Sequence, residues 1–298
     1  MDTSLQTGLA GWSRLDERLA ALAFRHGRCA VAAHEFAWFG LKQAWACLFG
    51  GCMVGLLLAS GLWWPAGAPV ARYDALTLAA ILIQVALVTL RLETRREAAV
   101  ILLFHVVGTA MEVFKTAMGS WVYPEPSVLR IAGVPLFTGF MYAAVGSYIA
   151  RAWRLFDFRF TAHPPLWAGI LLSVAIYANF FTHHFLPDAR PLLFAAMVVA
   201  FGRTWVHFRI RAIHRRMPLL AGLVLVALFI WFAENAGTFA RAWVYPAQRG
   251  GWHVVAPEKI GAWLLLMTIS YVMVWTVQRA GPQACADDPA RGQRYIRR

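Results

Sequence analysis

Long apolar runs separated by short polar segments dominate this chain. Eight runs approach or reach the roughly 20 residues that an α-helix needs to cross a bilayer. They lie at residues 48–64, 76–90, 98–111, 134–153, 166–181, 192–206, 219–233 and 260–277. We therefore predict an all-α polytopic membrane bundle with about eight transmembrane helices.

An internal repeat organises these runs. Residues 112–124 read EVFKTAMGSWVYP and residues 234–246 read ENAGTFARAWVYP, so both follow the pattern E-x3-T-x4-W-V-Y-P. Such self-similarity indicates a duplicated structural unit. Because each half holds an even number of predicted spans, we expect two four-helix repeats of the same orientation, related by a pseudo-twofold axis along the membrane normal.

The repeat sets the expected organisation of the chain. Residues 41–160 form the first four-helix repeat and residues 161–279 the second, followed by a basic cytoplasmic tail at 280–298. In the segment 1–40, one helical face carries Trp12, Leu15, Leu19 and Leu22, which is typical of an amphipathic helix lying on a membrane surface. A solvated, frayed helix is the alternative interpretation.

Composition and charge agree with a membrane protein. The chain is 60% hydrophobic and only 14% charged, and its net charge is +13. The arginines and lysines concentrate in alternate connecting segments, a bias that marks the cytoplasmic side. Both termini are therefore expected to be cytoplasmic, and the basic excess indicates topology rather than a nucleic-acid partner. The four cysteines form no C-x-x-C pair, so neither a disulfide framework nor a zinc site is expected, and no cofactor is implied.

Ionisable groups inside a membrane are costly and are usually functional. Glu112 and Glu234 occupy the same place in the two repeats, near the outer ends of their helices. We predict that both act as catalytic acid and base groups or bind a cation. The alternative is that Glu112 pairs with Lys115 and Glu234 with Arg241. Arg203 is predicted as a further intramembrane charge, either an anion site or a partner for Asp157 or for a backbone carbonyl.

Polar and aromatic side chains on the odd-numbered spans and their loops are expected to line a common cavity with these glutamates. They are His105, Thr116, Trp121, Tyr123, Tyr177, Asn179, His183, His184, Asn235, Thr238, Trp243 and Tyr245. His183 and His184 are adjacent, and adjacent helical residues point about 100° apart. They are therefore not expected to share a metal ion, and no metal site is predicted.

The chain resembles the YoaT-type family of bacterial integral membrane proteins over roughly residues 38–278, through segments such as FGLKQAWACLFG, EVFKTAMGSWVYPE, NFFTHHFLPDAR and IWFAENAGTFARAWVYP. This resemblance implies an inner-membrane protein and supplies no activity.

The first half is also faintly similar to membrane lycopene cyclases and carotenoid hydratases, through Glu112, Gly119, the Trp-Val-Tyr at 121–123 and the Gly-Val-Pro at 133–135. The Pro-x-Glu-Glu signature of the cyclases is absent. This similarity implies a buried carboxylic acid that protonates a polyene.

The sequence therefore predicts a membrane-embedded enzyme that acts on a lipid or isoprenoid by carboxylate acid and base chemistry, with membrane lipids as its partners. A transporter or channel for a small solute, and a structural or sensory protein without turnover, are the alternatives.

Overall fold

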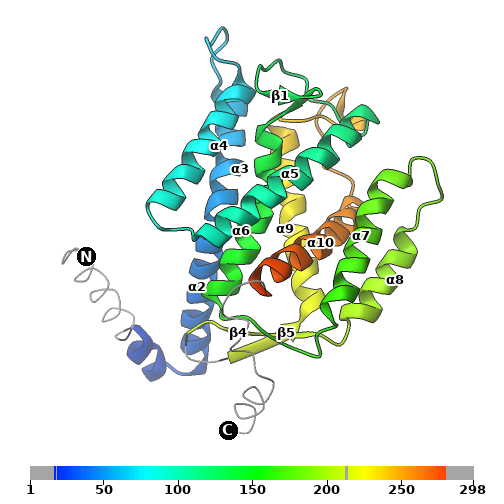
Figure 1. Cartoon of the computed structure of the whole chain (residues 1–298). Coiled ribbons are helices and arrows are strands. Elements are labelled where there is room, and N and C mark those ends of the chain that lie inside the picture. The colour runs from blue at the N-terminus through cyan, green and yellow to red at the C-terminus, as the bar shows by residue number, and fades with distance from the viewer. Residues whose placement is uncertain (1–16, 18, 212–213, 280–298) are drawn as a thin grey trace.

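The computed structural model describes residues 17, 19–211 and 214–279 (Figure 1). The predicted tail at 280–298 and the residues Trp12 and Leu15 lie outside this part of the chain. The helices are α2 (Arg28–Ala46), α3 (Leu48–Trp63), α4 (Arg72–Thr89), α5 (Arg95–Ala117), α6 (Phe137–Leu155), α7 (Leu166–Thr182), α8 (Arg190–Phe201), α9 (Leu219–Phe239) and α10 (Lys259–Arg279), with a short 3-10 helix η1 (Pro246–Gln248). Each of the eight predicted apolar runs thus corresponds to a helix.

The chain is a multi-pass membrane protein. Within the described residues, length and composition mark α4, α5 from Arg96 onward, α9 and α10 as candidate spans. The consecutive helices α2 and α3 form a fifth candidate, broken by a bend of 70°. Helices α7 and α8 are apolar but shorter. The expected extent of the sixth run, 192–206, is wrong because α8 ends at Phe201 and the chain then enters a strand.

This early end of α8 changes the position of Arg203. The residue lies in the turn between α8 and the strand, and it is exposed. Thr204 holds the turn, since its amide donates to the carbonyl of Phe201 at 2.9 Å and its hydroxyl donates to that of Ala162 at 3.1 Å. Arg203 is therefore not the intramembrane charge that the sequence predicts.

Helix α6 is the centre of the fold and contacts α2, α3, α4, α5 and α10. Its approach to α5 depends on small residues, as is usual between membrane helices. A Cβ atom added at Gly108 of α5 would lie 2.6 Å from the ring of Tyr142, and one at Gly139 of α6 would lie 2.4 Å from His105. These two glycines let the helices pack at close range.

Short strands close the two ends of the bundle. At one end, β3 (Arg159–Thr161), β4 (Trp205–Arg209) and β5 (His214–Pro218) form an antiparallel sheet with Val206 opposite Met217. At the other end, β1 (Arg130–Ile131) pairs with β2 (Val134–Pro135). Figure 1 places these features at the bottom and top of the molecule, and we call them the sheet end and the loop end.

Near the sheet end, a buried ion pair fixes the turn between α4 and α5 to α6. Arg151 is fully buried, and its Nη2 lies 2.7 Å from Oε1 of Glu93. The same carboxylate accepts hydrogen bonds from Ser147 and Gln84. The pair joins α6 to the turn that precedes α5.

The two Trp-Val-Tyr-Pro segments pair with each other at the loop end. The backbone amides and carbonyls of Val122 and Val244 exchange two hydrogen bonds, each 3.0 Å long. The neighbouring helix contacts also come in matched sets: α6 contacts α3, α4 and α5, and α10 contacts α7, α8 and α9.

Candidate functional site

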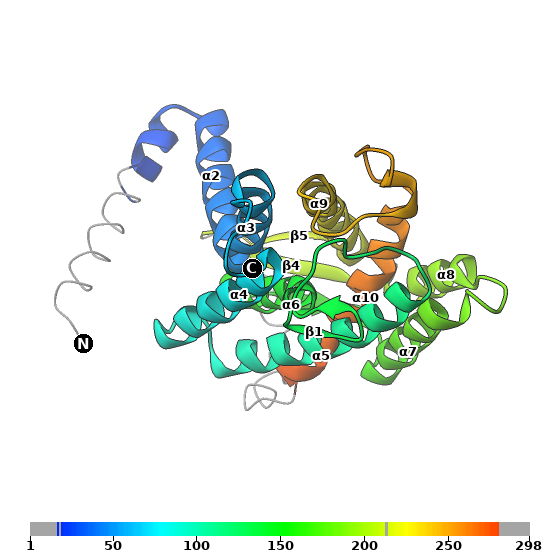
Figure 2. The same cartoon turned by 90° about the horizontal axis from the view of Figure 1, so that it is seen from above.

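A cavity of about 1020 Å³ lies between the bent α2–α3 pair, α6, α9 and α10. Seen from above, α2 and α3 stand on one side and α9 on the other, and α6 and α10 lie below them in the picture (Figure 2). Most of its lining is aliphatic or aromatic and includes Val54, Val145, Val226, Phe229 and Leu266. Such a cavity accepts an apolar ligand of substantial size.

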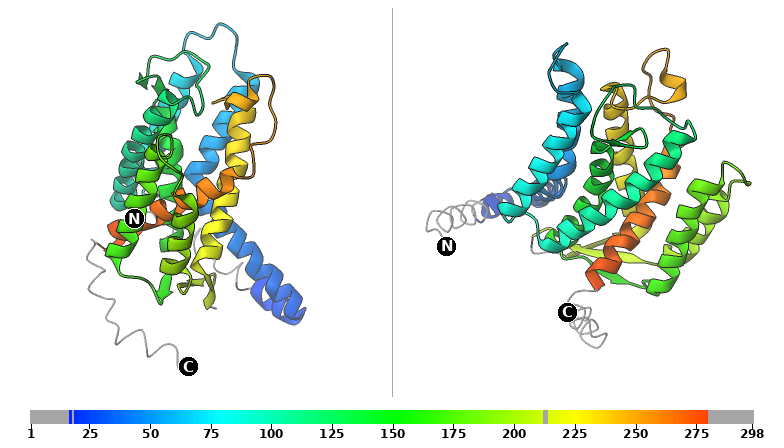
Figure 3. Two further views of the ribbon diagram at one scale, coloured as in Figure 1. Left: turned by 90° about the vertical axis from the view of Figure 1, so that its right-hand side faces the viewer. Right: turned by 45° about the horizontal axis from the view of Figure 1, so that its top comes forward.

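The close approach of α3 to α9 bounds this cavity toward the loop end. A Cβ atom added at Gly61 of α3 would lie 2.8 Å from Cβ of Ala240, just after α9. In the other direction, α2 turns away from α9 (Figure 3). The cavity is thus bounded on the loop side, and the exposed side chains of Phe229 and Phe232 of α9 are among its lining residues.

Glu112 of α5 lines the cavity and is held by three aromatic donors. Its Oε2 accepts from Nε1 of Trp121 at 2.8 Å and from the hydroxyl of Tyr123, and its Oε1 accepts from the hydroxyl of Tyr142 at 2.7 Å. The side chain is 4% exposed. Hydrogen bonds of this kind fix the carboxylate in place without a cation.

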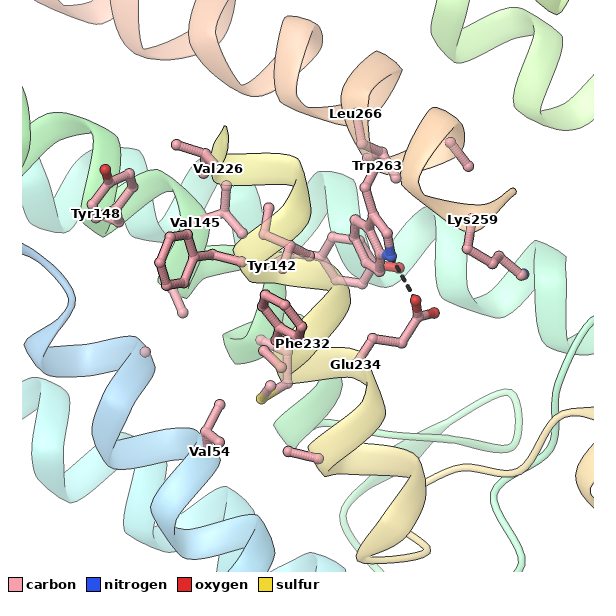
Figure 4. Close-up of a pocket in the computed structure, with 18 of the residues that line it drawn as sticks. Val54, Tyr142, Val145, Tyr148, Val226, Phe232, Glu234, Lys259, Trp263 and Leu266 are labelled. Carbon is pink, nitrogen blue, oxygen red and sulfur yellow. Dashed lines mark hydrogen bonds between the residues drawn. The ribbon is translucent and has the colours of Figure 1, made fainter. Parts of the chain in front are cut away.

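Glu234 of α9 lines the same cavity and has two such donors. Nε1 of Trp263 donates to Oε2 at 2.7 Å (Figure 4), and the hydroxyl of Tyr245 donates to Oε1. In both copies of the motif, therefore, the tyrosine of Trp-Val-Tyr-Pro donates to the preceding glutamate. The tryptophans differ, because Trp243 packs against Gly237.

The ion pairs of the alternative interpretation do not form. Lys115 contacts imidazoles instead, with Nζ 3.3 Å from Nε2 of His183 and 3.0 Å from Nε2 of His184. Arg241 follows α9 with a positive φ of 54°, and its carbonyl accepts from Arg72 at 3.0 Å. The hydrogen-bond partners of both glutamates are therefore aromatic side chains.

Half of the predicted cavity residues line this cavity together with the glutamates. They are Trp121, Tyr123, Asn179, His183, Trp243 and Tyr245. The structure places the other six outside the lining: His105, Thr116, Tyr177, His184, Asn235 and Thr238.

The six residues outside the cavity pack between elements. Tyr177 donates to the carbonyl of Val107 at 3.1 Å and so joins α7 to α5. His105 packs against Phe140 with ring centroids 4.6 Å apart. Three more positions have structural contacts: Asn235 accepts from the amide of Val255, Thr238 accepts from Trp252, and His184 bonds Lys115. The Oγ1 atom of Thr116 is buried and has no hydrogen-bond partner among the described residues.

The rings of His183 and His184 lie close together just after the end of α7. Helix α7 ends at Thr182, and the two rings lie with centroids 4.2 Å apart, both against Lys115. The expectation that they point apart is wrong because it assumed that the helix continues. Among the described residues, no group of three or more histidine, cysteine, aspartate or glutamate side chains is arranged to hold a metal ion.

Three important side chains of the site are not among the residues predicted from the sequence: Tyr142, Trp263 and Lys259. Tyr142 and Trp263 occupy nearly equivalent places on α6 and α10, each on the helix that follows its glutamate. Comparing the two halves beyond the motif would have found them. Nζ of Lys259 lies over the rings of Tyr245 and Trp121, 4.3 and 5.7 Å from their centroids.

Comparison with known proteins gives one family and two distant structures. The family described as "Protein of unknown function (DUF817)" matches residues 35–271. The uncharacterized protein YoaT of Bacillus subtilis (strain 168) is 41% identical over 253 residues, which cover 85% of this chain and 95% of that protein.

Two crystal structures of MvINS overlap with this fold in part. A cross-linked MvINS trimer has a TM-score of 0.45 and 16% identity, covering 64% of this chain and 98% of that one. MvINS, described as a mycobacterial Insig homolog from Mycobacterium vanbaalenii, has a TM-score of 0.43 and 16% identity, covering 61% and 93%.

Proposed function

The chain belongs to the DUF817 family of proteins of unknown function, and we propose that it is a membrane enzyme that binds a lipid or isoprenoid and acts on it through Glu112 and Glu234. One observation carries the proposal: an apolar cavity of about 1020 Å³ ends at two buried carboxylates. An apolar chain fits the lining, and the carboxylates are the reactive groups beside it.

The hydrogen bonds favour a catalytic use of Glu234 in particular. Each of its oxygens has one donor, whereas Glu112 has three donors in all. A carboxylate oxygen has room for about two hydrogen bonds. Glu234 therefore keeps acceptor capacity at both oxygens. In this proposal it exchanges a proton with the ligand as a general acid or base, while Glu112 orders the aromatic wall.

The same proposal includes two parallel four-helix repeats, a bacterial inner-membrane location and cytoplasmic termini. The mutual backbone pairing of Val122 and Val244 and the matched helix contacts of α6 and α10 support the repeats. The location and orientation rest on the charge pattern and on the family resemblance.

The alternatives find less support. A transporter needs a polar path between charges at more than one depth, but most of the cavity lining is aliphatic or aromatic. A purely structural protein needs no cavity, but the one described here is large.

Binding is tested by filling the cavity. Val226 lines it, whereas Val224, two residues earlier on α9, does not. We expect lipid that copurifies with the protein in detergent, measured by native mass spectrometry, to fall severalfold in Val226→Trp and to stay unchanged in the matched control Val224→Trp. Equal lipid in both variants would contradict a lipid-binding cavity.

Turnover is tested by neutral replacement of the carboxylates. Overexpression of the protein should change the cellular lipid or isoprenoid profile, and Glu234→Gln should abolish that change while retaining bound lipid. Glu17→Gln, at an exposed position that precedes α2 and does not line the cavity, is the control. A profile that responds equally to the wild type and to Glu234→Gln would exclude catalysis by this group.

A further inference from the structure

A group of basic side chains gathers where α5, α7, α8 and α10 meet near the loop end of the cavity. We call Lys115, His183, His184, Arg190 and Lys259 the basic cluster. Four of them line the cavity, His184 being the exception. They come from the last turn of α5, the turn after α7 and the first residues of α8 and α10. In Figure 4, Lys259 lies beyond Glu234 and Trp263, on the side opposite to Tyr148.

Lys115 is the central member, because it is buried without an acidic partner. Its side chain is 6% exposed. Among the described residues, no carboxylate lies within ion-pair distance of it, and its nearest polar contacts are the two imidazole nitrogens of His183 and His184. Burying an ammonium group without an anion costs several kcal/mol in general. An anion bound beside Lys115 would offset this cost.

The histidines leave Lys115 one N–H group for a ligand. Nδ1 of His183 lies 2.8 Å from the carbonyl of Asn179, so Nδ1 carries the proton and Nε2 accepts from Lys115. Partial burial, and after it the charge of Lys115, lowers the pKa of His184, which keeps that ring neutral as a second acceptor. An ammonium group has three donors, and these two bonds use two of them.

The other members point to an anion as well. Lys259 and Arg190 are the first residues of α10 and α8, whose N-termini carry partial positive charge. Arg190 is paired with Asp188 at 2.5 Å, whereas Lys259 lies over aromatic rings and interacts with Glu234 only from beyond ion-pair distance. Lys115 and Lys259 can therefore both donate to one bound anion.

We propose that the basic cluster binds the phosphate headgroup of an anionic lipid whose apolar chain occupies the cavity. This inference rests on the proposed lipid-binding function and adds the class of headgroup. The phosphate oxygens would accept from Lys115 and Lys259, which supplies the missing anion, and the cavity continues from there along Val145 and Val226. The headgroup would also lie beside Glu234, next to the group proposed to react.

The experiment compares the headgroup preference of charge variants. Purified protein is exchanged with an equimolar mixture of phosphatidylglycerol and diacylglycerol bearing the same acyl chains, and the bound lipids are quantified by mass spectrometry. Wild type should prefer the anionic lipid, and Lys115→Met should reduce that preference by about tenfold, the size expected for losing one charge-assisted hydrogen bond. Lys115→Arg should retain it. Lys42→Met, whose Nζ bonds the carbonyls of Leu155 and Arg209 at the sheet end, is the matched control.

The outcomes separate the two proposals. An unchanged headgroup preference in both Lys115→Met and Lys259→Met, with lipid binding still sensitive to Val226→Trp, would overturn the headgroup inference and leave the cavity proposal in place. Lipid binding that Val226→Trp does not reduce would overturn both. Displacement of the lipid by inorganic phosphate alone would show that the cluster binds a free anion, and that result also contradicts the inference.

Discussion

Aromatic donors, not cations, hold the two glutamates of the candidate site. Five hydroxyl or indole groups surround Glu112 and Glu234, and four of them come from the two Trp-Val-Tyr-Pro segments and α6. This arrangement keeps each carboxylate oriented and leaves the nearby lysines available for other partners. The loop motif therefore has a direct role in building the site.

Removing one donor should weaken the fold only if its glutamate is present. Tyr123→Phe deletes a hydrogen bond to a buried carboxylate, and we expect a loss of roughly 1.5–3 kcal/mol in unfolding free energy. In the Glu112→Gln background the same change should cost much less, which a double-mutant cycle measures by thermal unfolding in detergent. Equal costs in both backgrounds would show that Tyr123 stabilises the protein through packing alone.

His163, in the segment between β3 and α7, gives the fold a specific sensitivity to acid. Its Nε2 lies 2.6 Å from the hydroxyl of Tyr271, and its ring packs against Trp275. Burial, and to a lesser extent the charge of Arg279, lowers the pKa of His163 below its ordinary 6.5. The unfolded chain therefore takes up this proton at a higher pH than the folded protein does.

Stability should consequently fall as the pH drops below about 6.5, because the unfolded state then binds more protons. Above that pH this residue should contribute no slope. We expect the unfolding temperature of the wild type to decrease more steeply between about pH 7 and pH 5 than that of His163→Phe. Identical slopes would assign the acid sensitivity to other groups.

The sequence reveals the glutamates but not most of their partners. Glu112 and Glu234 stand out because ionisable residues are rare within apolar runs. Tyr142 and Trp263 do not, because aromatic residues are common on membrane helices and only the approach of α6 and α10 brings them to the carboxylates. His105 and Tyr177 fit a polar stripe at helical spacing, yet that spacing does not say whether the stripe faces a cavity or another helix.

At the scale of elements, the turn from α4 to α5 is held by side chains from three helices. Thr94 and Glu97 form a capping box at the start of α5, and Glu93 beside them is paired with buried Arg151 of α6. The sequence predicts the helices on either side but not this ion pair, because a charge pattern records the number and position of charges, not their burial. A buried pair of this kind constrains where α5 enters the bundle.

Breaking this pair should cost far more than breaking its exposed neighbour. Arg151→Met leaves Glu93 buried without its cation, so we expect a loss of about 3–5 kcal/mol. Arg154→Met, one turn later, removes an ion pair to buried Glu97 whose arginine is 48% exposed. The expected loss is about 1 kcal/mol, because Glu97 keeps the hydrogen bond from the amide of Thr94. Adding Glu93→Gln to Arg151→Met should recover part of the stability. Similar losses for the two arginine variants would contradict the buried geometry.

At the scale of the whole molecule, the two halves meet through the motif that they share. The repeat predicts a relation between Glu112 and Glu234, but no sequence pattern shows that the two Trp-Val-Tyr-Pro segments pair with each other. The bridge between Val122 and Val244 joins the loop after α5 to the loop after α9 and so places both glutamates at one cavity. Separation of these loops would also separate the walls of the site.

This pairing can be tested with a disulfide. Residues that exchange both backbone hydrogen bonds lie with Cα atoms about 5.5 Å apart, within the usual range for a disulfide. In a background with the native cysteines replaced by serine, Val122→Cys with Val244→Cys should resist maleimide labelling until a reductant is added. The bond closes a long loop, so the unfolding free energy should rise by roughly 4 kcal/mol.

Val128→Cys with Val244→Cys is the control, because Val128 is highly exposed in the same loop region. Equal protection in both pairs would mean that these loops are not held in the paired arrangement, and the cavity would then lack a fixed end.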